Sequence, residues 1–312
     1  MLVSILIPVY NVEEYVEAAI RSIMDQTYKD LEIIIVDDCS SDSTFDICKK
    51  LQEHDSRIKL FKNENNQKIC FTLNRAYRLS CGDMIARMDG DDISEPDRIS
   101  QQVAYLSANP EIDLVGVSLI GIDSTGRPLG KFVHLSNENL LLKTMQYVTP
   151  VSHVWVARRS VYDTLGGYRN IPGCEDYDFL LRMHTRGLRF NNVPDYFGYK
   201  VRLLRSGNTQ SLIGIAQRQI FSYIYELYKS GRLDENKYVS ASMLQKITST
   251  PNFYKKLYKF SNVFLSRAIT AKSRKKAGLL TFYLILSLIS PHQIRYLLSR
   301  VQYRVICWYA AL

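Results

Sequence analysis

The sequence lacks the features that mark several classes of protein. Its six cysteines, at positions 39, 48, 70, 81, 174 and 307, form no C-x-x-C pair and show no regular spacing. This distribution argues against a zinc site and against a disulfide framework, and it favours a reducing compartment. No charged segment precedes an apolar core at the N-terminus, so we expect no signal peptide.

Two nucleotide-binding motifs and long apolar runs are also missing. No G-x-G-x-x-G follows the first apolar run, which argues against a dinucleotide-binding domain for hydride transfer, and no P-loop occurs. The uncharged apolar run at residues 277–290 has 14 residues. A membrane-spanning helix needs roughly 20.

Apolar sequence is nevertheless sufficient for a sizeable core. Of the 312 residues, 46% are hydrophobic and 23% are charged, as in ordered globular proteins. A chain of this length corresponds to one large domain or two modest ones.

Charge divides the chain into an acidic and a basic part. Residues 1–197 contain 21 Lys and Arg against 28 Asp and Glu, whereas residues 198–312 contain 19 against 3. Such a basic part fits nucleic acid or an anionic membrane surface. The cluster Lys272-Ser273-Arg274-Lys275-Lys276, directly before the apolar run, favours the membrane and argues against nucleic acid. Two interpretations of the run stay open, a helix in the membrane interface and a helix packed on the rest of the protein.

Alternating strand and helix patterns predict an open α/β fold. We expect strands at residues 2–9, 31–36, 58–61 and 84–88, with helices between them at 12–26, up to about 54, and at 69–79. Asn11 is expected to cap the first helix. Further on, the patterns predict strands at 112–122 and 151–157 and helices at 97–108 and 136–146. Strands that alternate with helices pair in parallel, and ligands bind beyond their carboxyl ends.

Three carboxylates, Asp89, Asp91 and Asp92, follow the strand at 84–88 within four residues. Mutual repulsion disfavours this grouping unless a cation lies among them, and Mg²⁺ or Mn²⁺ holding diphosphate oxygens is the natural candidate. A solvated acidic turn that caps the next helix is the alternative, because D-x-D alone is a weak signal.

Polar side chains also follow the first two strands. Asp38 could accept hydrogen bonds from a nucleobase or ribose, and Tyr10 could stack on the base. Each alone is better explained as a helix cap or a turn residue. Together with Asp89 and Asp91, they predict one pocket for a nucleoside diphosphate.

A second acidic cluster, Glu175-Asp176, begins a predicted helix. The helix dipole favours negative charge at that end, which explains both residues without any chemistry. A chemical role requires this turn to face the pocket. His153 is a further candidate, either as a contact to phosphate or acceptor or as a hydrogen-bonded structural histidine.

These motifs resemble those of the family-2 glycosyltransferases, which have the GT-A fold. The match covers roughly residues 1–200. The matching segments are Pro8-Val9-Tyr10-Asn11, Asp37-Asp38-Cys39-Ser40, Leu73-Asn74-Arg75-Ala76, Ala86-Arg87-Met88-Asp89-Gly90-Asp91-Asp92, His153 with Arg158-Arg159, Gly166-Gly167-Tyr168 and Glu175-Asp176-Tyr177-Asp178.

The fold that the resemblance implies is an α/β fold, Rossmann-like, with a mostly parallel sheet flanked by helices. This GT-A catalytic domain would cover residues 1–205. Residues 206–312 match the family poorly and are expected to form a basic helical C-terminal region, with amphipathic helices at 212–228, 238–247, 253–269 and 277–310.

The activity that the resemblance implies is transfer of a sugar, with inversion, from a nucleotide-sugar donor, a UDP-sugar being favoured. Asp176 would be the general base, and Asp91, with Asp89, would hold Mn²⁺ or Mg²⁺ and the diphosphate. The residues implied in substrate binding are Pro8, Tyr10, Asp38, Lys68, Asn74, Asp89, His153 and Glu175. Among them, Lys68 stands where the family usually has glycine.

The setting implied is surface polysaccharide synthesis in bacteria, with a saccharide or lipid-linked saccharide as acceptor. The protein would be cytoplasmic and bound peripherally to the anionic inner face of the cell membrane. Two other functions stay open. One is a metal-dependent phosphohydrolase or nucleotidyltransferase with the same carboxylates, and the other is a non-catalytic sugar-nucleotide-binding protein.

Overall fold

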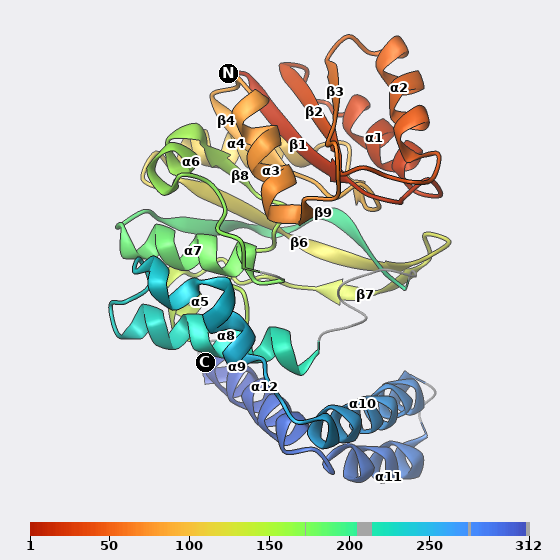
Figure 1. The fold of residues 1–312 in the computed structure, drawn as a ribbon, viewed down its shortest axis with the longest axis vertical. Coiled ribbons are helices and arrows are strands. Elements are labelled where there is room, and N and C mark those ends of the chain that lie inside the picture. The colour runs from red at the N-terminus through yellow and green to blue at the C-terminus, as the bar shows by residue number, and fades with distance from the viewer. Residues whose placement is uncertain (172, 205–213, 274–275, 310–312) are drawn as a thin grey trace. The chain divides into compact units, whose positions relative to one another are not determined.

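The structure is a computed structural model that describes residues 1–171, 173–204, 214–273 and 276–309 (Figure 1). The chain divides into two compact units. The first comprises Met1–Leu142 and Thr149–Leu212, and the second comprises Lys143–Val148 and Ile213–Leu312. The predicted domain boundary between residues 205 and 206 lies outside the described residues and stays a prediction.

Within the described residues, nine strands of the first unit form one sheet, in the order β3-β2-β1-β4-β8-β6-β9-β5 with β7 on β6. Strands β1 (Val3–Val9), β2 (Leu31–Asp37), β3 (Ile58–Lys62) and β4 (Met84–Arg87) pair in parallel, as the sequence predicts. Their carboxyl ends therefore meet at one edge of the sheet.

Helices cover both faces of these parallel strands. Val3, Ile5 and Ile7 of β1 belong to the main core cluster, which α1 (Val16–Met24), α2 (Thr44–His54) and α4 (Arg98–Ala108) complete. Helix α3 (Lys68–Leu79) packs on β1 and β2 (Figure 1). Burial on both faces explains why β1 and β2 are almost wholly apolar.

The second half of the sheet is mixed. Strand β8 (Val156–Arg158) runs antiparallel to both β4 and β6 (Leu114–Asp123), and β7 (Pro128–Phe132) runs antiparallel to β6. The long strand β9 (Phe190–Leu204) pairs in parallel with β6 and antiparallel with the short β5 (Ile93–Ser94). Through β5, strand β9 reaches the turn that follows β4.

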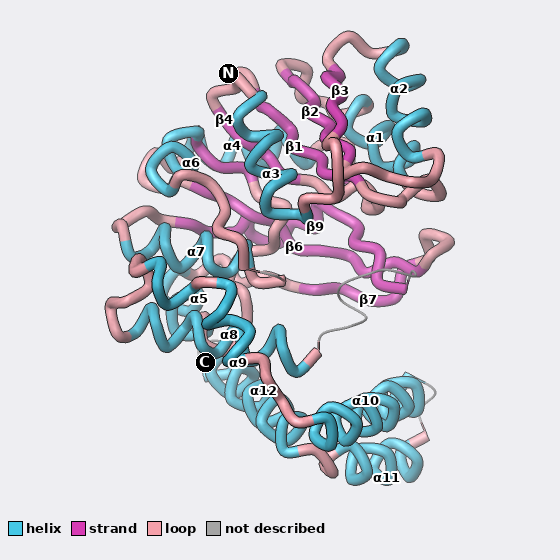
Figure 2. Tube along the Cα trace, in the orientation of Figure 1, coloured by secondary structure: helices cyan, strands magenta, loops and turns pink. Residues whose placement is uncertain are grey.

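Helices α6 (Arg159–Leu165) and α7 (Glu175–Thr185) complete the first unit, and the short helix α5 (Glu138–Thr144) begins in the first unit and ends in the second. Figure 2 shows that α6 directly follows β8 and that α7 follows a loop. The first turn of α7 carries Glu175, Asp176 and Asp178, so the predicted acidic helix start is confirmed.

Two local predictions are wrong. The strand expected at 151–157 is regular only over β8, and residues 151–155 form bends and loop although all of them except His153 are buried. Ser152, for example, donates its hydroxyl to the carbonyl of Val117 (3.1 Å). Asn11 does not cap α1, because the N-cap of this helix is Tyr15. The Oδ1 of Asn11 instead accepts the N–H of Ser41 (2.9 Å), and Asn11 has φ of 49°.

The second unit is helical. Its helices are α8 (Ile215–Lys229), α9 (Ala241–Ile247), α10 (Asn252–Ser273), α11 (Ala277–Ser287) and α12 (Pro291–Tyr309), with a 3₁₀ turn at Asn236–Val239. The stripe predicted at 277–310 is two helices, separated where Pro291 begins α12 and lacks an N–H to continue α11. Residues 212 and 213 of the first predicted stripe lie outside the described residues. No helix in the described ranges has the length and hydropathy to cross a bilayer.

Candidate active site

The acidic turn after β4 is held closely against the carboxyl end of β1. Met88 donates its N–H to the carbonyl of Leu6 (3.1 Å), and Asp89 donates its N–H to the hydroxyl of Tyr199 (3.1 Å). A Cβ on Gly90 would lie 2.6 Å from Cγ1 of Val9, so only glycine allows the turn to approach the strand this closely. The turn is therefore a fixed part of the sheet edge.

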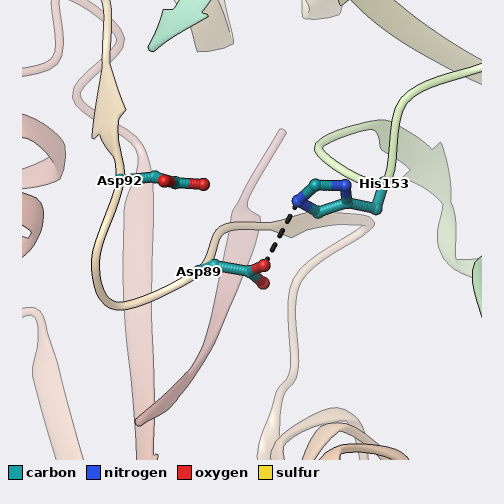
Figure 3. Close-up of side chains that lie close together, drawn as sticks. All are labelled: Asp89, Asp92 and His153. Atoms are coloured by element: carbon teal, nitrogen blue, oxygen red, sulfur yellow. Dashed lines mark ion pairs between the residues drawn. The ribbon is translucent and has the colours of Figure 1, made fainter. Parts of the chain in front are cut away.

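Asp89, Asp92 and His153 converge beside this turn. Figure 3 shows their side chains pointing toward a common space from the end of β4, the segment before β5 and the segment before β8. One ligand atom of each lies within 4.8 Å of those of the other two. Nε2 of His153 is 3.2 Å from Oδ2 of Asp89. The sequence predicted Asp89 and His153 for this pocket, but Asp92 was not assigned a role.

Residues of strand β9 hold the side chain of Asp92 through hydrogen bonds. The N–H of Arg202 donates to Oδ1 of Asp92 (2.7 Å), and the Tyr199 hydroxyl also bonds to this carboxylate. Arg202 donates its Nε–H to the carbonyl of Asp91 (2.9 Å). Asp91 itself is half-buried in the same turn and is not among the three clustered residues. Its role as direct metal ligand stays a prediction.

The charges of this group are strongly coupled. Burial alone would raise the pKa of Asp89, but Arg87 and His153 outweigh it and hold the pKa well below its usual range. Burial, Asp91 and Asp89 together raise the pKa of Asp92 well above its usual value. Burial lowers the pKa of His153, yet the attraction of Asp89 raises it overall. A second ionised carboxylate beside Asp89 is therefore unfavourable unless a cation is present.

The donor set suits a divalent cation. Two carboxylates and an imidazole within 4.8 Å of one another are ligands that Mn²⁺ accepts. The residues present therefore fit the cation that the GT-A fold implies.

Arg87 joins this turn to the first turn of α7. Its buried side chain, only 4% exposed, lies 3.4 Å from Oδ1 of Asp89 and 3.4 Å from Oε1 of Glu175. Asp176 follows Glu175 in the same turn, and its negative charge contributes to raising the pKa of both Arg87 and His153. The acidic start of α7 therefore faces the pocket, which the sequence could not decide.

Asp38 directly follows β2, at the same edge of the sheet. Its Oδ1 accepts from Nδ2 of Asn63 (2.7 Å) and from the N–H of Gln67 (2.8 Å), and its Oδ2 accepts from the N–H of Lys68 (2.9 Å). Lys68 has φ of 69°, a conformation that glycine adopts most readily, which is consistent with the glycine that the family resemblance implies at this position. Its side chain is exposed.

Three other predicted residues take different positions. Pro8 is buried near the end of β1, and Tyr10, just beyond it, is 47% exposed and available for stacking. Two hydrogen bonds join the side chain of Asn74 to the backbone of Tyr168. Nδ2 of Asn74 donates to the carbonyl of Tyr168 (2.8 Å), and Oδ1 of Asn74 accepts the N–H of Tyr168 (2.8 Å). Asn74 therefore holds the loop before α7, and its role in substrate binding stays a prediction.

Four residues of the site received no role from the sequence. Arg87 had a signal, since it is the one charged residue within an otherwise apolar buried strand. Asp92 was recognised only as a third carboxylate. No sequence signal marks Tyr199 and Arg202. They follow their partners in the acidic turn by 110 positions, and the pairing of β9 with β5 brings them into contact with it.

Comparison with known proteins gives a consistent result. The model of Glycosyl transferase family 2 matches residues 4–166, more than half of the chain. EpsE of Bacillus subtilis, named as a putative glycosyltransferase, is 36% identical over 206 residues, covering 64% of this chain and 72% of its own length. The O-antigen biosynthesis glycosyltransferase WbnJ of Escherichia coli is 30% identical over 200 residues, covering 62% of this chain and 77% of its own.

Solved structures share the fold. TarS 1–349 of S. aureus, in complex with UDP-GlcNAc, superposes with a TM-score of 0.61 over 91% of this chain and 90% of its own, at 16% identity. The mannosyltransferase PcManGT of Pyrobaculum calidifontis, with GDP-Man and Mn²⁺, gives 0.58 over 92% and 86%, at 17% identity. The predicted GT-A fold is confirmed, and this chain is a glycosyltransferase of family 2.

Proposed function

We propose that the protein transfers a sugar from a nucleoside diphosphate donor to a hydroxyl of a saccharide or lipid-linked saccharide during surface polysaccharide synthesis. Supporting this, relatives named for O-antigen and amylovoran synthesis align over much of the chain. Structures of the same fold hold UDP-GlcNAc and GDP-Man. The observation that carries the proposal is that the acidic turn after β4 and the acidic start of α7 face each other through Arg87.

The residues take distinct roles in this proposal. Tyr10 stacks on the base and Asp38 orders the loop around the nucleoside. Asp176 takes the proton from the acceptor hydroxyl while that oxygen attacks the anomeric carbon, and the nucleoside diphosphate leaves from the opposite face. Asp89, Asp91, Asp92 and His153 are the residues that would hold a divalent cation. When bound, such a cation supplies positive charge that stabilises the departing diphosphate.

The helical second unit supports a location at an anionic membrane surface. Helix α11 contains no charged residue, and α10 presents the exposed lysines 255, 256 and 259. Large apolar side chains that are more than half exposed recur on α10, α11 and α12: Phe253, Phe260, Phe282, Ile285, Leu298, Val301, Trp308 and Tyr309. Basic residues beside exposed apolar ones are typical of helices that lie in a membrane interface.

A calorimetric titration tests the donor. Purified protein is titrated with UDP-, GDP-, CDP- and dTDP-linked sugars, first with Mn²⁺ and then with the cation chelated. We expect binding of the UDP-sugar that is lost on chelation. Donor consumption that needs a saccharide separates a transferase from a phosphohydrolase, and no binding by folded protein would contradict the proposal.

A further inference from the structure

The guanidinium of Arg87 is shared between two carboxylates that belong to different parts of the fold. Nε and Nη2 each lie 3.4 Å from Oδ1 of Asp89, and Nη1 and Nη2 each lie 3.4 Å from Oε1 of Glu175. Asp89 follows β4 and Glu175 begins α7. A planar guanidinium can span two anions in this way, whereas the compact ammonium of lysine contacts them as a point charge.

The surroundings of Arg87 shield this link from water. The side chains of Arg87 and Glu175 are 4% and 9% exposed, so little water screens the pair. The ring of Tyr168 lies 5.9 Å from the guanidinium carbon. All four N–O distances are at the long end of the hydrogen-bond range, so neither carboxylate holds Arg87 exclusively. We expect a shift of Asp89 to change the position of Glu175 through this shared guanidinium.

Glu175 is well placed to transmit such a shift to the reaction. It precedes Asp176 in the first turn of α7, so their backbones move together. Further along this helix, Arg182 anchors α7 by donating to the carbonyls of Leu165 (2.8 Å) and Gly167 (2.7 Å), and it also donates to Asp178 (2.9 Å) of the same helix. Arg182 fixes the body of the helix, and Arg87 orients its N-terminal turn.

We propose that Arg87 is a positioning residue that aligns Asp176 with the donor by tying Glu175 to Asp89. This inference rests on the proposed function, in which Asp176 acts on the acceptor. Arg87 contacts no reacting atom in this scheme. Its loss should misplace Asp176 and lower turnover while donor binding, which depends on the nucleoside and diphosphate contacts, persists.

The test compares Arg87→Lys with Arg182→Lys. Both replace a buried arginine that holds a carboxylate, but only the first breaks the link to Asp89. Donor affinity is measured by calorimetry. Turnover is measured as nucleoside diphosphate released from the sugar nucleotide that the titration selects, in the presence of a saccharide for which the wild-type protein consumes this donor. For Arg87→Lys we expect donor affinity within about threefold of wild type and turnover at saturating donor lower by about tenfold or more.

Arg182→Lys serves as the structural control. It should lower the melting temperature without a comparable loss of turnover at a temperature where both variants are folded. Equal losses of affinity and turnover in Arg87→Lys would make Arg87 a donor-binding residue and overturn the inference. So would wild-type turnover in Arg87→Lys.

A double-mutant cycle tests the route through Glu175. If Arg87 acts through this carboxylate, Arg87→Lys/Glu175→Gln should turn over no more slowly than the slower single variant. Multiplicative losses would overturn the inference. Glu175→Gln also tests the link from its other end if Arg87→Lys does not fold. Wild-type protein that binds no donor would instead contradict the proposed function itself.

Discussion

Nε2 of His153 lies 3.2 Å from Oδ2 of Asp89, joining the segment before β8 to the turn after β4. Each residue alone is compatible with an ordinary structural role. Their convergence with Asp92 forms a group of oxygen and nitrogen donors at the carboxyl edge of the sheet. This edge is where ligands of open α/β sheets bind.

Replacement of His153 is expected to weaken Mn²⁺ binding. His153→Ala removes one donor of the group and should lower the affinity for Mn²⁺ by roughly 10–100-fold. The measurement is a calorimetric titration with Mn²⁺ alone. His184→Ala, a histidine of α7 outside this group, is the control and should bind Mn²⁺ like wild type. Unchanged affinity in His153→Ala would exclude His153 as a ligand.

Asp176→Asn and Asp91→Ala should separate turnover from binding. Asp176→Asn removes the proposed base and is expected to lower turnover by about 10² or more, with nearly intact donor affinity. Asp91→Ala should weaken the cation-dependent affinity for the donor itself. Calorimetry and steady-state kinetics on both variants provide the comparison. An equal loss of donor affinity in the two would remove the basis for assigning Asp176 as base.

Gly167 should tolerate alanine less well than Gly187 does. Both have positive φ, 81° and 74°, so each alanine variant carries a backbone penalty of about 1 kcal/mol. At Gly167 the added Cβ would also lie 2.4 Å from Oδ1 of Asn74, which Tyr168 holds in place, whereas at Gly187 nothing lies within 4 Å. Overpacking should add about 1–3 kcal/mol to the loss of unfolding free energy in Gly167→Ala. Urea denaturation of both variants measures the difference, and equal losses would contradict the clash.

Glu32 should make the protein's stability depend on pH in the acid range. Burial raises the pKa of this carboxyl, but hydrogen bonds from Lys59, Ser4 and Cys81 outweigh it and lower the pKa from 4.5 to about 2. A lowered folded pKa stabilises the fold above the unfolded value, and this stability is lost as pH falls from about 4.5 towards 2.

Glu32→Gln should remove this part of the pH dependence and should be less stable than wild type at neutral pH. Unfolding free energies from urea denaturation across a pH series measure both effects. Glu53→Gln, at an exposed position on α2, is the control and should follow the wild-type curve. A Glu32→Gln curve parallel to wild type below pH 4.5 would contradict the role of Glu32.

The basic helices should bind anionic vesicles in a salt-dependent manner. Reversing Lys255, Lys256 and Lys259 to glutamate should weaken binding to phosphatidylglycerol vesicles, because each basic residue near such a surface contributes about 1 kcal/mol. Vesicle sedimentation at low and high salt measures this, with phosphatidylcholine vesicles as reference. Lys49→Glu/Lys50→Glu on α2 is the matched control. Absence of binding to anionic vesicles at low salt by the wild-type protein would refute the membrane proposal.

The sequence by itself determined the parallel half of the sheet and the residues at its carboxyl edge. The runs that became β1, β2 and β4 are recognisable because strands buried on both faces are continuously apolar, and polar residues such as Asp38 and Asp89 mark where each strand ends. These patterns lie within short segments of the chain, so they can be recognised without any knowledge of tertiary contacts. The same holds for the helical pattern that places Glu175 and Asp176 at a helix start.

Only the tertiary structure decided how these parts meet. That Arg87 reaches Glu175, or that Tyr199 and Arg202 of β9 support the acidic turn, depends on pairing between segments about 90–110 positions apart. Such contacts leave no periodic signal, because a buried arginine or tyrosine is specified by its partner rather than by its neighbours in the chain. Asn11 shows the same effect, since a contact to Ser41 displaced the local helix cap that the sequence predicted.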